Sequence, residues 1–215
     1  MKPMIIPSKS NTTSAIILSS ALLTLVLSCP MGTLAADSAD AKAPASTEAA
    51  AAKLEPKFSK PGLVTAAGQS SDIAVVKALL NTRLKLGLEI KPMAAATELG
   101  DSKTLVIVLG ASTKGMGAAG LDLDKEIERT KAVVKAAKEK GIKILGLHVG
   151  GESRRGKTTN DLLEVVVPEC THVVVVASGN KDKMFNTLAA KNNVPLTEVQ
   201  NLAGAGDAVK ALFLQ

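Results

Sequence analysis

The feature that most constrains the fold of this chain is a series of short, almost wholly apolar runs. "TLVIVLG" (104–110) and "THVVVVA" (171–177) are rich in β-branched residues, as strands buried on both faces of a sheet must be. Similar runs predict four more strands, at 63–67, 88–92, 143–150 and 196–200.

Segments with helical periodicity separate these runs. In 71–85, Ile73, Val76, Leu80 and Leu84 recur on one helical stripe behind a serine or aspartate cap. The longest helix is predicted over 122–140, with acidic residues at its start, lysines at its end and a glycine stop. Further helices are predicted at 158–167, 181–193 and 205–213.

Strands that alternate with helices predict a parallel sheet with right-handed crossovers. We therefore expect residues 61–215 to form a single α/β domain, a three-layer sandwich with helices on both faces. Its five- to six-stranded, mostly parallel sheet is expected to have the flavodoxin-like order 2-1-3-4-5, with a sixth strand at the edge.

The first 35 residues are typical of an export signal. Lys2 and Lys9 precede the apolar core "AIILSSALLTLVL" (15–27), which is too short for the about 20 residues that a membrane-spanning helix needs. Cleavage after Ala35 in "TLAA" is one outcome. Lipidation of Cys29, in the lipobox-like "VLSC", is a second, and an uncleaved anchor is a third. The first two predict an exported protein without a transmembrane helix.

Residues 36–60 are rich in alanine and carry proline, serine and mixed charges. Because this composition offers too little large apolar surface to offset the entropy of ordering, we expect a disordered linker.

Charge and aromatic content exclude several partners. Removing Lys2 and Lys9 lowers the formal net charge from +6 to +4, and no basic run is interleaved with aromatic residues, which argues against nucleic acid. The chain has no Trp, no Tyr and 3 Phe, so platforms for stacking bases or flavin rings are nearly absent. We expect no cofactor.

Metal and thiol chemistry also lack support. The chain has 2 His and 2 Cys, without the spacing of a metal site. Cys170 precedes a strand and is predicted to be a buried thiol, and His148 is predicted to be a core residue.

Three motifs in the glycine-rich loops are incomplete. "GASTKGMGAAG" (110–120) contains a GxGxxG pattern, but it starts six residues after the strand and no acidic residue ends a strand about 20 residues later. Met116 stands where a P-loop needs its lysine. In "GQSSD" (68–72), Asp72 replaces the last glycine of a nucleophile elbow.

Position in the fold is more informative than these motifs. In a 2-1-3-4-5 sheet the strand order reverses between strands 1 and 3, and ligands bind at the carboxyl ends there. The loops that meet at that edge are 68–72, 110–120, 150–161 and 178–183. Their candidate ligand-binding residues are Gln69, Ser70, Ser112, Lys114, Gly115, Gly117, Glu152, Arg154, Arg155, Asn180 and Lys181.

Paired arginines beside glycines that allow close backbone approach favour an anionic ligand. Other interpretations remain open: Arg154 and Arg155 as a solvated surface pair, Glu152 as an acid or as their ion-pair partner, and the serines as helix caps.

"VTAAGQSSD", "GASTKGMGAAGLDLDKEI", "GLHVGGESRRG" and "ASGNKDKMFNTLA" together resemble an uncharacterised family of exported bacterial domains of unknown function. The resemblance covers about residues 61–215. It implies an exported α/β domain and assigns no activity or catalytic residue.

The sequence thus predicts an exported binding module for a small anionic molecule. The alternatives are a hydrolase or transferase acting on a phosphorylated or carboxylated substrate, for which no complete catalytic motif is present, and a protein-interaction component of the envelope.

Overall fold

The computed structural model describes residue 55 and residues 57–213. The predicted signal segment, both processing sites and most of the predicted linker lie outside these residues. In the described part, no helix is both long enough and apolar enough to cross a membrane.

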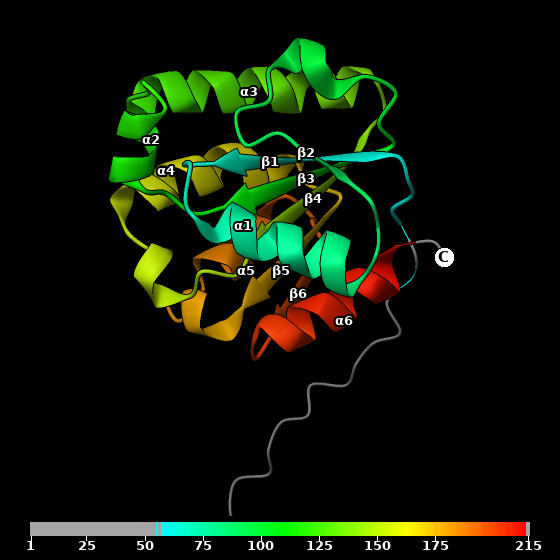
Figure 1. The fold of residues 1–215 in the computed structure, drawn as a ribbon. Coiled ribbons are helices and arrows are strands. Elements are labelled where there is room, and N and C mark those ends of the chain that lie inside the picture. Colours follow the sequence, from blue (N-terminus) through cyan, green and yellow to red (C-terminus); the bar gives the residue numbers. More distant parts are fainter. Residues whose placement is uncertain (1–54, 56, 214–215) are drawn as a thin grey trace, which may run out of the picture. The chain divides into compact units, whose positions relative to one another are not determined.

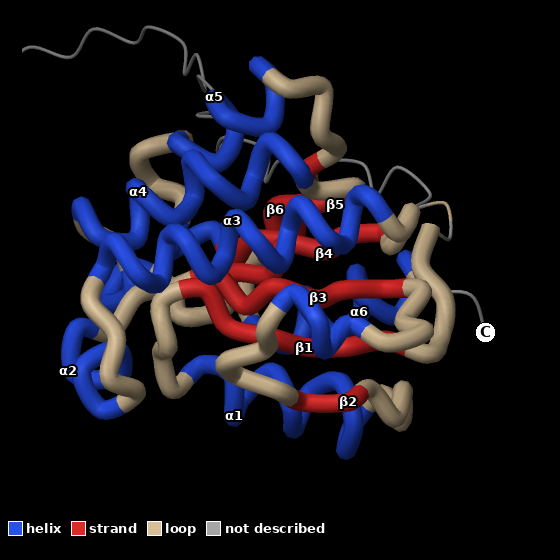
Figure 2. The backbone as a smooth tube through the Cα atoms, turned by 90° about the horizontal axis from the view of Figure 1, so that it is seen from above, coloured by secondary structure: helices blue, strands red, loops and turns tan. Residues whose placement is uncertain are grey.

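A six-stranded, all-parallel sheet forms the centre of this part (Figures 1 and 2). Its order is β2-β1-β3-β4-β5-β6, which confirms the predicted order and the added edge strand. The strands are β1 (Gly62–Ala67), β2 (Glu89–Ile90), β3 (Thr104–Leu109), β4 (Lys143–His148), β5 (His172–Val176) and β6 (Leu196–Val199).

The central strands are buried on both faces because helices cover both. Every residue of β1, β3 and β5 is buried, which is what their unbroken apolar sequences predict. The edge strands β2 and β6 are only partly buried. At β2, the predicted strand 88–92 is reduced to two residues.

Three helices pack on one face of the sheet: α3 (Leu123–Glu139), α4 (Lys157–Val166) and α5 (Met184–Lys191) (Figure 2). Their apolar stripes meet Leu105, Ile107 and Ile144 of the sheet in one buried cluster. The capping carboxylate of Asp122 accepts from the backbone N–H of Lys125 at 2.8 Å, which fixes the start of α3.

The other face carries α1 (Asp72–Lys77), its π-helical continuation η1 (Ala78–Arg83), and α6 (Leu202–Leu212). These elements contribute Val76, Leu80 and Val209 to a second buried cluster. Two apolar layers around one sheet give the predicted three-layer sandwich.

The folded region begins before the predicted boundary at Pro61. Phe58 is fully buried, and its ring centroid lies 5.7 Å from that of Phe213. The backbone N–H groups of Lys57 and Phe58 both donate to the carbonyl of Leu212. Residues 57–60 therefore belong to the domain and not to the linker, because an aromatic side chain fills the space beneath α6.

The segment predicted as one long loop, 110–120, contains a short helix, α2 (Thr113–Ala118). Single-turn elements η2 (Ala96–Leu99), η3 (Glu152–Arg154), η4 (Val167–Glu169) and η5 (Ala177–Gly179) lie in other connections. Of these elements, α2, η3 and η5 follow the carboxyl ends of β3, β4 and β5, at the edge where the sequence placed its candidate site.

Candidate functional site at the carboxyl ends of the strands

The two loops at the reversal of strand order pack tightly against each other. A Cβ atom added to Gly68 would lie 2.5 Å from the Cα of Ala111, and one added to Gly115 would lie 2.0 Å from the carbonyl oxygen of Gln69. Gln69 and Ala111 also form an isolated β-bridge. Gly68 and Gly115 therefore allow these loops to touch, whereas Gly117 faces open space.

Ser112 and Lys114 lie on the start of α2. The hydroxyl of Ser112 accepts from the backbone N–H of Gly115 at 3.0 Å and so caps the helix. Lys114 is exposed, and its ammonium makes no ion pair with any described residue.

Arg154 lies over the reversal point and reaches across to α1. Its Nε donates to Asp72 Oδ1 at 3.2 Å, and its Nη2 donates to Ser71 Oγ at 2.8 Å. Its Nη1 makes no hydrogen bond to the described residues, and 28% of the side chain is exposed. One edge of this guanidinium is therefore available to a ligand.

Beneath Arg154 lies the carboxylate of Asp72, which the sequence suggested as a helix cap and as the residue that breaks the nucleophile-elbow pattern, but not as part of the site. Asp72 is 7% exposed, and its Oδ2 has no hydrogen-bond partner among the described residues. A Cβ atom on Gly150 would lie 2.2 Å from this oxygen, and one on Gly110 would lie 3.2 Å from it. Both glycines therefore leave room for the side chain of Asp72. Ser70 is buried beside it, with its Oγ 3.4 Å from the backbone nitrogen of Asp72.

Both terminal nitrogens of Arg155 are engaged within the protein, whereas its buried Nε has no hydrogen-bond partner among the described residues. Its Nη1 and Nη2 donate to the two carboxylate oxygens of Asp182 at 3.0 and 2.9 Å. The same nitrogens donate to the Gly179 carbonyl at 2.6 Å and the Asn160 side chain at 2.7 Å. The guanidinium carbon lies 5.3 Å from the ring centroid of Phe185. The sequence placed the two arginines together as ligand contacts, but they point to different partners.

The remaining candidates also have partners within the protein. Glu152 forms an exposed ion pair with Lys181 and does not pair with either arginine. Asn180 is fully buried, and its Nδ2 donates to Asn186 and Glu198, both at 2.6 Å. These side chains link the η3, η5 and β6 connections to one another.

A buried ion pair that the sequence analysis missed supports the same edge. Glu126 of α3 is fully buried and accepts from the backbone N–H of Gly68 at 2.8 Å and from Gln69 Nε2 at 3.0 Å. Arg129 donates to Glu126 from Nε at 2.8 Å. The helical periodicity of the sequence could have indicated the burial of Glu126, because it lies on the same helical stripe as the buried residues Thr130, Val133 and Ala137.

His148 is a core residue, as predicted. It is fully buried, with Nδ1 2.8 Å from the carbonyl oxygen of Leu109 and Nε2 3.2 Å from that of Gly151. Burial lowers its pKa, against the smaller raising effect of these two carbonyls.

The structure puts neither Ser70 nor Ser71 in hydrogen-bond contact with a histidine in the described part of the chain. In the same part of the chain, no three His, Cys, Asp or Glu residues lie close enough together to bind a metal ion.

An open parallel sheet, helices on both faces and polar loops at the carboxyl edge define this protein as a doubly wound α/β domain. Residues 59–213 match the model of a domain of unknown function, DUF6305, and the chain belongs to that family. This confirms the resemblance to an uncharacterised family. None of the curated proteins compared with the chain matches it significantly.

Several solved structures match parts of this chain at low similarity. A GDSL-like lipase from Bacteroides thetaiotaomicron VPI-5482 is 12% identical with a TM-score of 0.34, and the match covers 70% of this chain and 84% of that one. The esterase EstA from Pseudoalteromonas sp. is 9% identical with a TM-score of 0.29, covering 65% and 78%. Hydroxymethylglutaryl-CoA lyase from Pseudomonas aeruginosa is 14% identical with a TM-score of 0.29, covering 74% of each chain.

Proposed function

We propose that this protein is an exported binding module that holds a small anionic molecule at the reversal point of its sheet, with Arg154 as the main charged contact. The half-engaged guanidinium of Arg154 carries the proposal: two of its nitrogens are fixed by Asp72 and Ser71, and the third is free among the described residues. An arginine held in this way loses little side-chain entropy when a carboxylate or phosphate binds its open edge.

The surroundings of Arg154 favour a small ligand. The loops at the reversal point are in van der Waals contact, so little of a ligand could enter between them. Asp72 offsets part of the charge of Arg154, and Lys114, exposed on α2 after β3, adds a positive charge at the same edge of the sheet. Together these groups suit one anionic group more than an extended polyanion.

Export is part of the same proposal and rests on residues 1–35. A basic start, an apolar run and small residues near Ala35 support it. A small-molecule module of the bacterial envelope is thus the function that the sequence and the site support together.

A thermal-shift experiment on the full chain tests the ligand class. Inorganic phosphate, small dicarboxylates and sugar phosphates are each added to wild type, to Arg154→Ala and to Arg83→Ala. Arg83 is the matched control because it lies at the end of η1, the continuation of α1 that is farthest from Ser71 and Asp72, and its guanidinium pairs with Asp207 of α6. A ligand at about 100 times its dissociation constant stabilises by about 2.7 kcal/mol, which raises the Tm by roughly 5 to 10 °C.

We expect one anion class to raise the Tm of wild type and of Arg83→Ala but not that of Arg154→Ala. Absence of any shift, or an equal shift in Arg154→Ala, would exclude the proposed site and favour a protein-interaction role for the same loops.

A further inference from the structure

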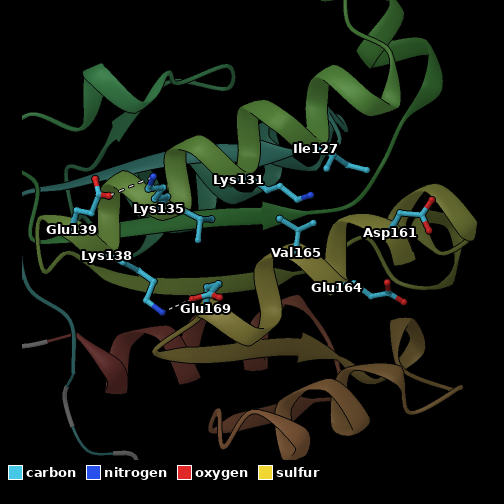
Figure 3. A pocket seen from close by; sticks show the side chains of 10 residues that line it. Ile127, Lys131, Lys135, Lys138, Glu139, Asp161, Glu164, Val165 and Glu169 are labelled. Carbon is cyan, nitrogen blue, oxygen red and sulfur yellow. Dashed lines mark hydrogen bonds and ion pairs between the residues drawn. The ribbon is translucent and has the colours of Figure 1, made fainter.

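A groove of about 750 Å³ runs between α3 and α4, on the outer surface of the helical layer (Figure 3). It is lined by Ile127, Lys131, Val134, Lys135, Lys138, Glu139, Asp161, Glu164, Val165 and Glu169. The function proposed above makes no use of these residues.

The two sides of the groove carry opposite charge. The α3 side presents Lys131, Lys135 and Lys138, with Glu139 as its one acidic residue. The α4 side presents Asp161, Glu164 and, in η4, Glu169, and no basic residue from this side lines the groove. The apolar residues that line the groove are Ile127 and Val165, labelled in Figure 3, and Val134.

These charges are only partly neutralised within the chain. Lys138 and Glu169 form an ion pair that bridges the groove at one end. Lys135 pairs with Glu139 at 3.8 Å along α3. Lys131 and Glu164, farther along the groove, form no ion pair with any described residue.

From this charge arrangement we infer that the groove is a homodimer interface, occupied by the same face of a second copy of this chain. A two-fold axis along the groove leaves the direction of each helix unchanged and exchanges its two sides. The α3 side of one copy then faces the α4 side of the other, so lysines meet carboxylates across the interface twice. A two-fold axis across the groove would instead place lysines against lysines.

Pairing across such an axis requires Lys131 and Glu164 to lie at similar heights along the groove. The ion pair between Lys138 and Glu169 gives a common point from which heights along both sides of the groove can be measured. Lys131 precedes Lys138 by about 10 Å and Glu164 precedes Glu169 by about 8 Å, at a helical rise of roughly 1.5 Å per residue. The two residues that lack partners within the chain are therefore in register for each other in a second copy.

The size of this face sets the expected strength of the dimer. An α3 of 17 residues is about 25 Å long and α4 of 10 residues is about 15 Å long. Two neighbouring helices, each about 10 Å wide, therefore present a face of about 500 Å² or less, which is smaller than the about 800 Å² per partner of a standard interface. The dimer should therefore dissociate on dilution, and salt should weaken it because its pairs are close to solvent.

Sedimentation velocity on the full chain, over a dilution series, tests this inference. Wild type should form a reversible dimer at about 0.1 M salt that is weakened at about 1 M, where the Debye length falls from about 10 Å to about 3 Å. Lys131→Glu alone and Glu164→Lys alone should each raise the dissociation constant at least about tenfold, since each places like charges opposite one another twice.

An equimolar mixture of the two variants provides the decisive control, because Glu at position 131 of one chain then faces Lys at position 164 of the other. The mixture should dimerise again, which also shows that both variants are folded. Lys77→Glu, on α1 at the opposite face of the sheet, should dimerise like wild type.

A wild type that stays monomeric at every concentration would overturn the inference. So would a dimer that both variants leave unchanged, or a mixture that fails to restore association. Anion binding at Arg154 does not enter these measurements, so this inference and the proposed function stand or fall separately.

Discussion

Arg129 donates from Nε to Glu126 Oε2 across 2.8 Å, and the carboxylate of Glu126 is completely removed from solvent. The Arg129 guanidinium also donates to the carbonyl groups of Ala66 and Ala94. This ion pair therefore ties α3 to the end of β1 and to the segment that follows β2. Because every one of these contacts is buried or nearly so, removal of either partner would leave an uncompensated charge.

We predict that Arg129→Met destabilises the fold by about 3–5 kcal/mol, the usual cost of leaving one charge of a buried pair alone. Urea unfolding followed by circular dichroism measures this. Addition of Glu126→Leu to Arg129→Met should recover part of the loss. Lys125→Gln, which removes an exposed pair with Asp122, should leave stability close to wild type. Equal effects of Arg129→Met and Lys125→Gln would show that the buried pair has no special role.

Arg155 is predicted to be a structural residue. Arg155→Lys keeps the charge but cannot donate to both oxygens of Asp182 and to Asn160 at once. We expect a loss of about 1–3 kcal/mol, the range for hydrogen bonds to a charged group. Thermal unfolding compares Arg155→Lys with Arg154→Lys. We expect the smaller loss of stability in Arg154→Lys, because Arg154 has fewer contacts within the protein. A larger loss for Arg154→Lys would reverse this assignment.

The fold was predictable because its determinants are local. Runs such as 104–109 are too apolar and too β-branched to lie anywhere but in the centre of a parallel sheet. The acidic start and basic end of α3 mark its limits. Phe58 was misassigned to the linker because an alanine-rich context hides a single aromatic residue, whose burial against Phe213 is a contact between distant segments.

The partners of the candidate residues were not predictable, for a related reason. The sequence brings Arg154 and Arg155 to the right edge, but nothing in it says that Arg154 reaches Asp72, 82 residues earlier, whereas Arg155 reaches Asp182. The sequence interpreted the glycines as sites where the backbone comes close to a ligand, which stays a prediction, and Gly117 faces open space. At Gly68 and Gly115 the approaching group is another loop of the same chain, and a sequence pattern alone cannot distinguish that loop from a ligand.

Two glycines of the same loop should respond in opposite ways to alanine. In Gly115→Ala the new methyl would lie 2.0 Å from the carbonyl oxygen of Gln69, which belongs to the backbone and cannot rotate away. We expect a loss of about 1–3 kcal/mol, typical of overpacking. Gly117→Ala meets no atom within 4 Å inside α2 and should gain about 0.5–1 kcal/mol from the loss of glycine flexibility. The urea midpoints of the two variants measure these changes. A change in stability of the same sign in both variants would contradict this packing.

Cys170 should be inert in the folded protein. Burial raises the pKa of its thiol to about 12, and its Sγ donates to the carbonyl of Val166 at 3.3 Å. Since the thiolate is the reactive form, an aromatic disulfide reagent at about pH 8 should modify Cys170 only after unfolding in urea. The experiment uses Cys29→Ser so that one thiol remains. Rapid reaction in native buffer would mean that the η4 region opens readily.

Mild acid should destabilise the fold through His172. Burial, aided by the positive charge of Lys57, lowers the pKa of this imidazole from 6.5 to about 4. Its Nδ1 has no hydrogen-bond partner in the described part of the chain, while its Nε2 lies 2.8 Å from Thr197 Oγ1. The unfolded chain takes up a proton as the pH falls below about 6.5, but the folded chain resists until about 4. The stabilising contribution is therefore complete above about pH 6.5 and is lost progressively towards pH 4.

Urea midpoints between about pH 4.5 and about pH 7.5 measure this loss, and His172→Gln provides the comparison because its amide can still bond to Thr197 while it does not titrate. We expect the free energy of unfolding of wild type to fall with decreasing pH more steeply than that of His172→Gln. A slope will remain in the variant because burial also lowers the pKa of His148. Identical slopes for the two proteins would show that His172 is protonated in the folded state as readily as in the unfolded one, and that the interior at the β5–β6 edge admits a charge.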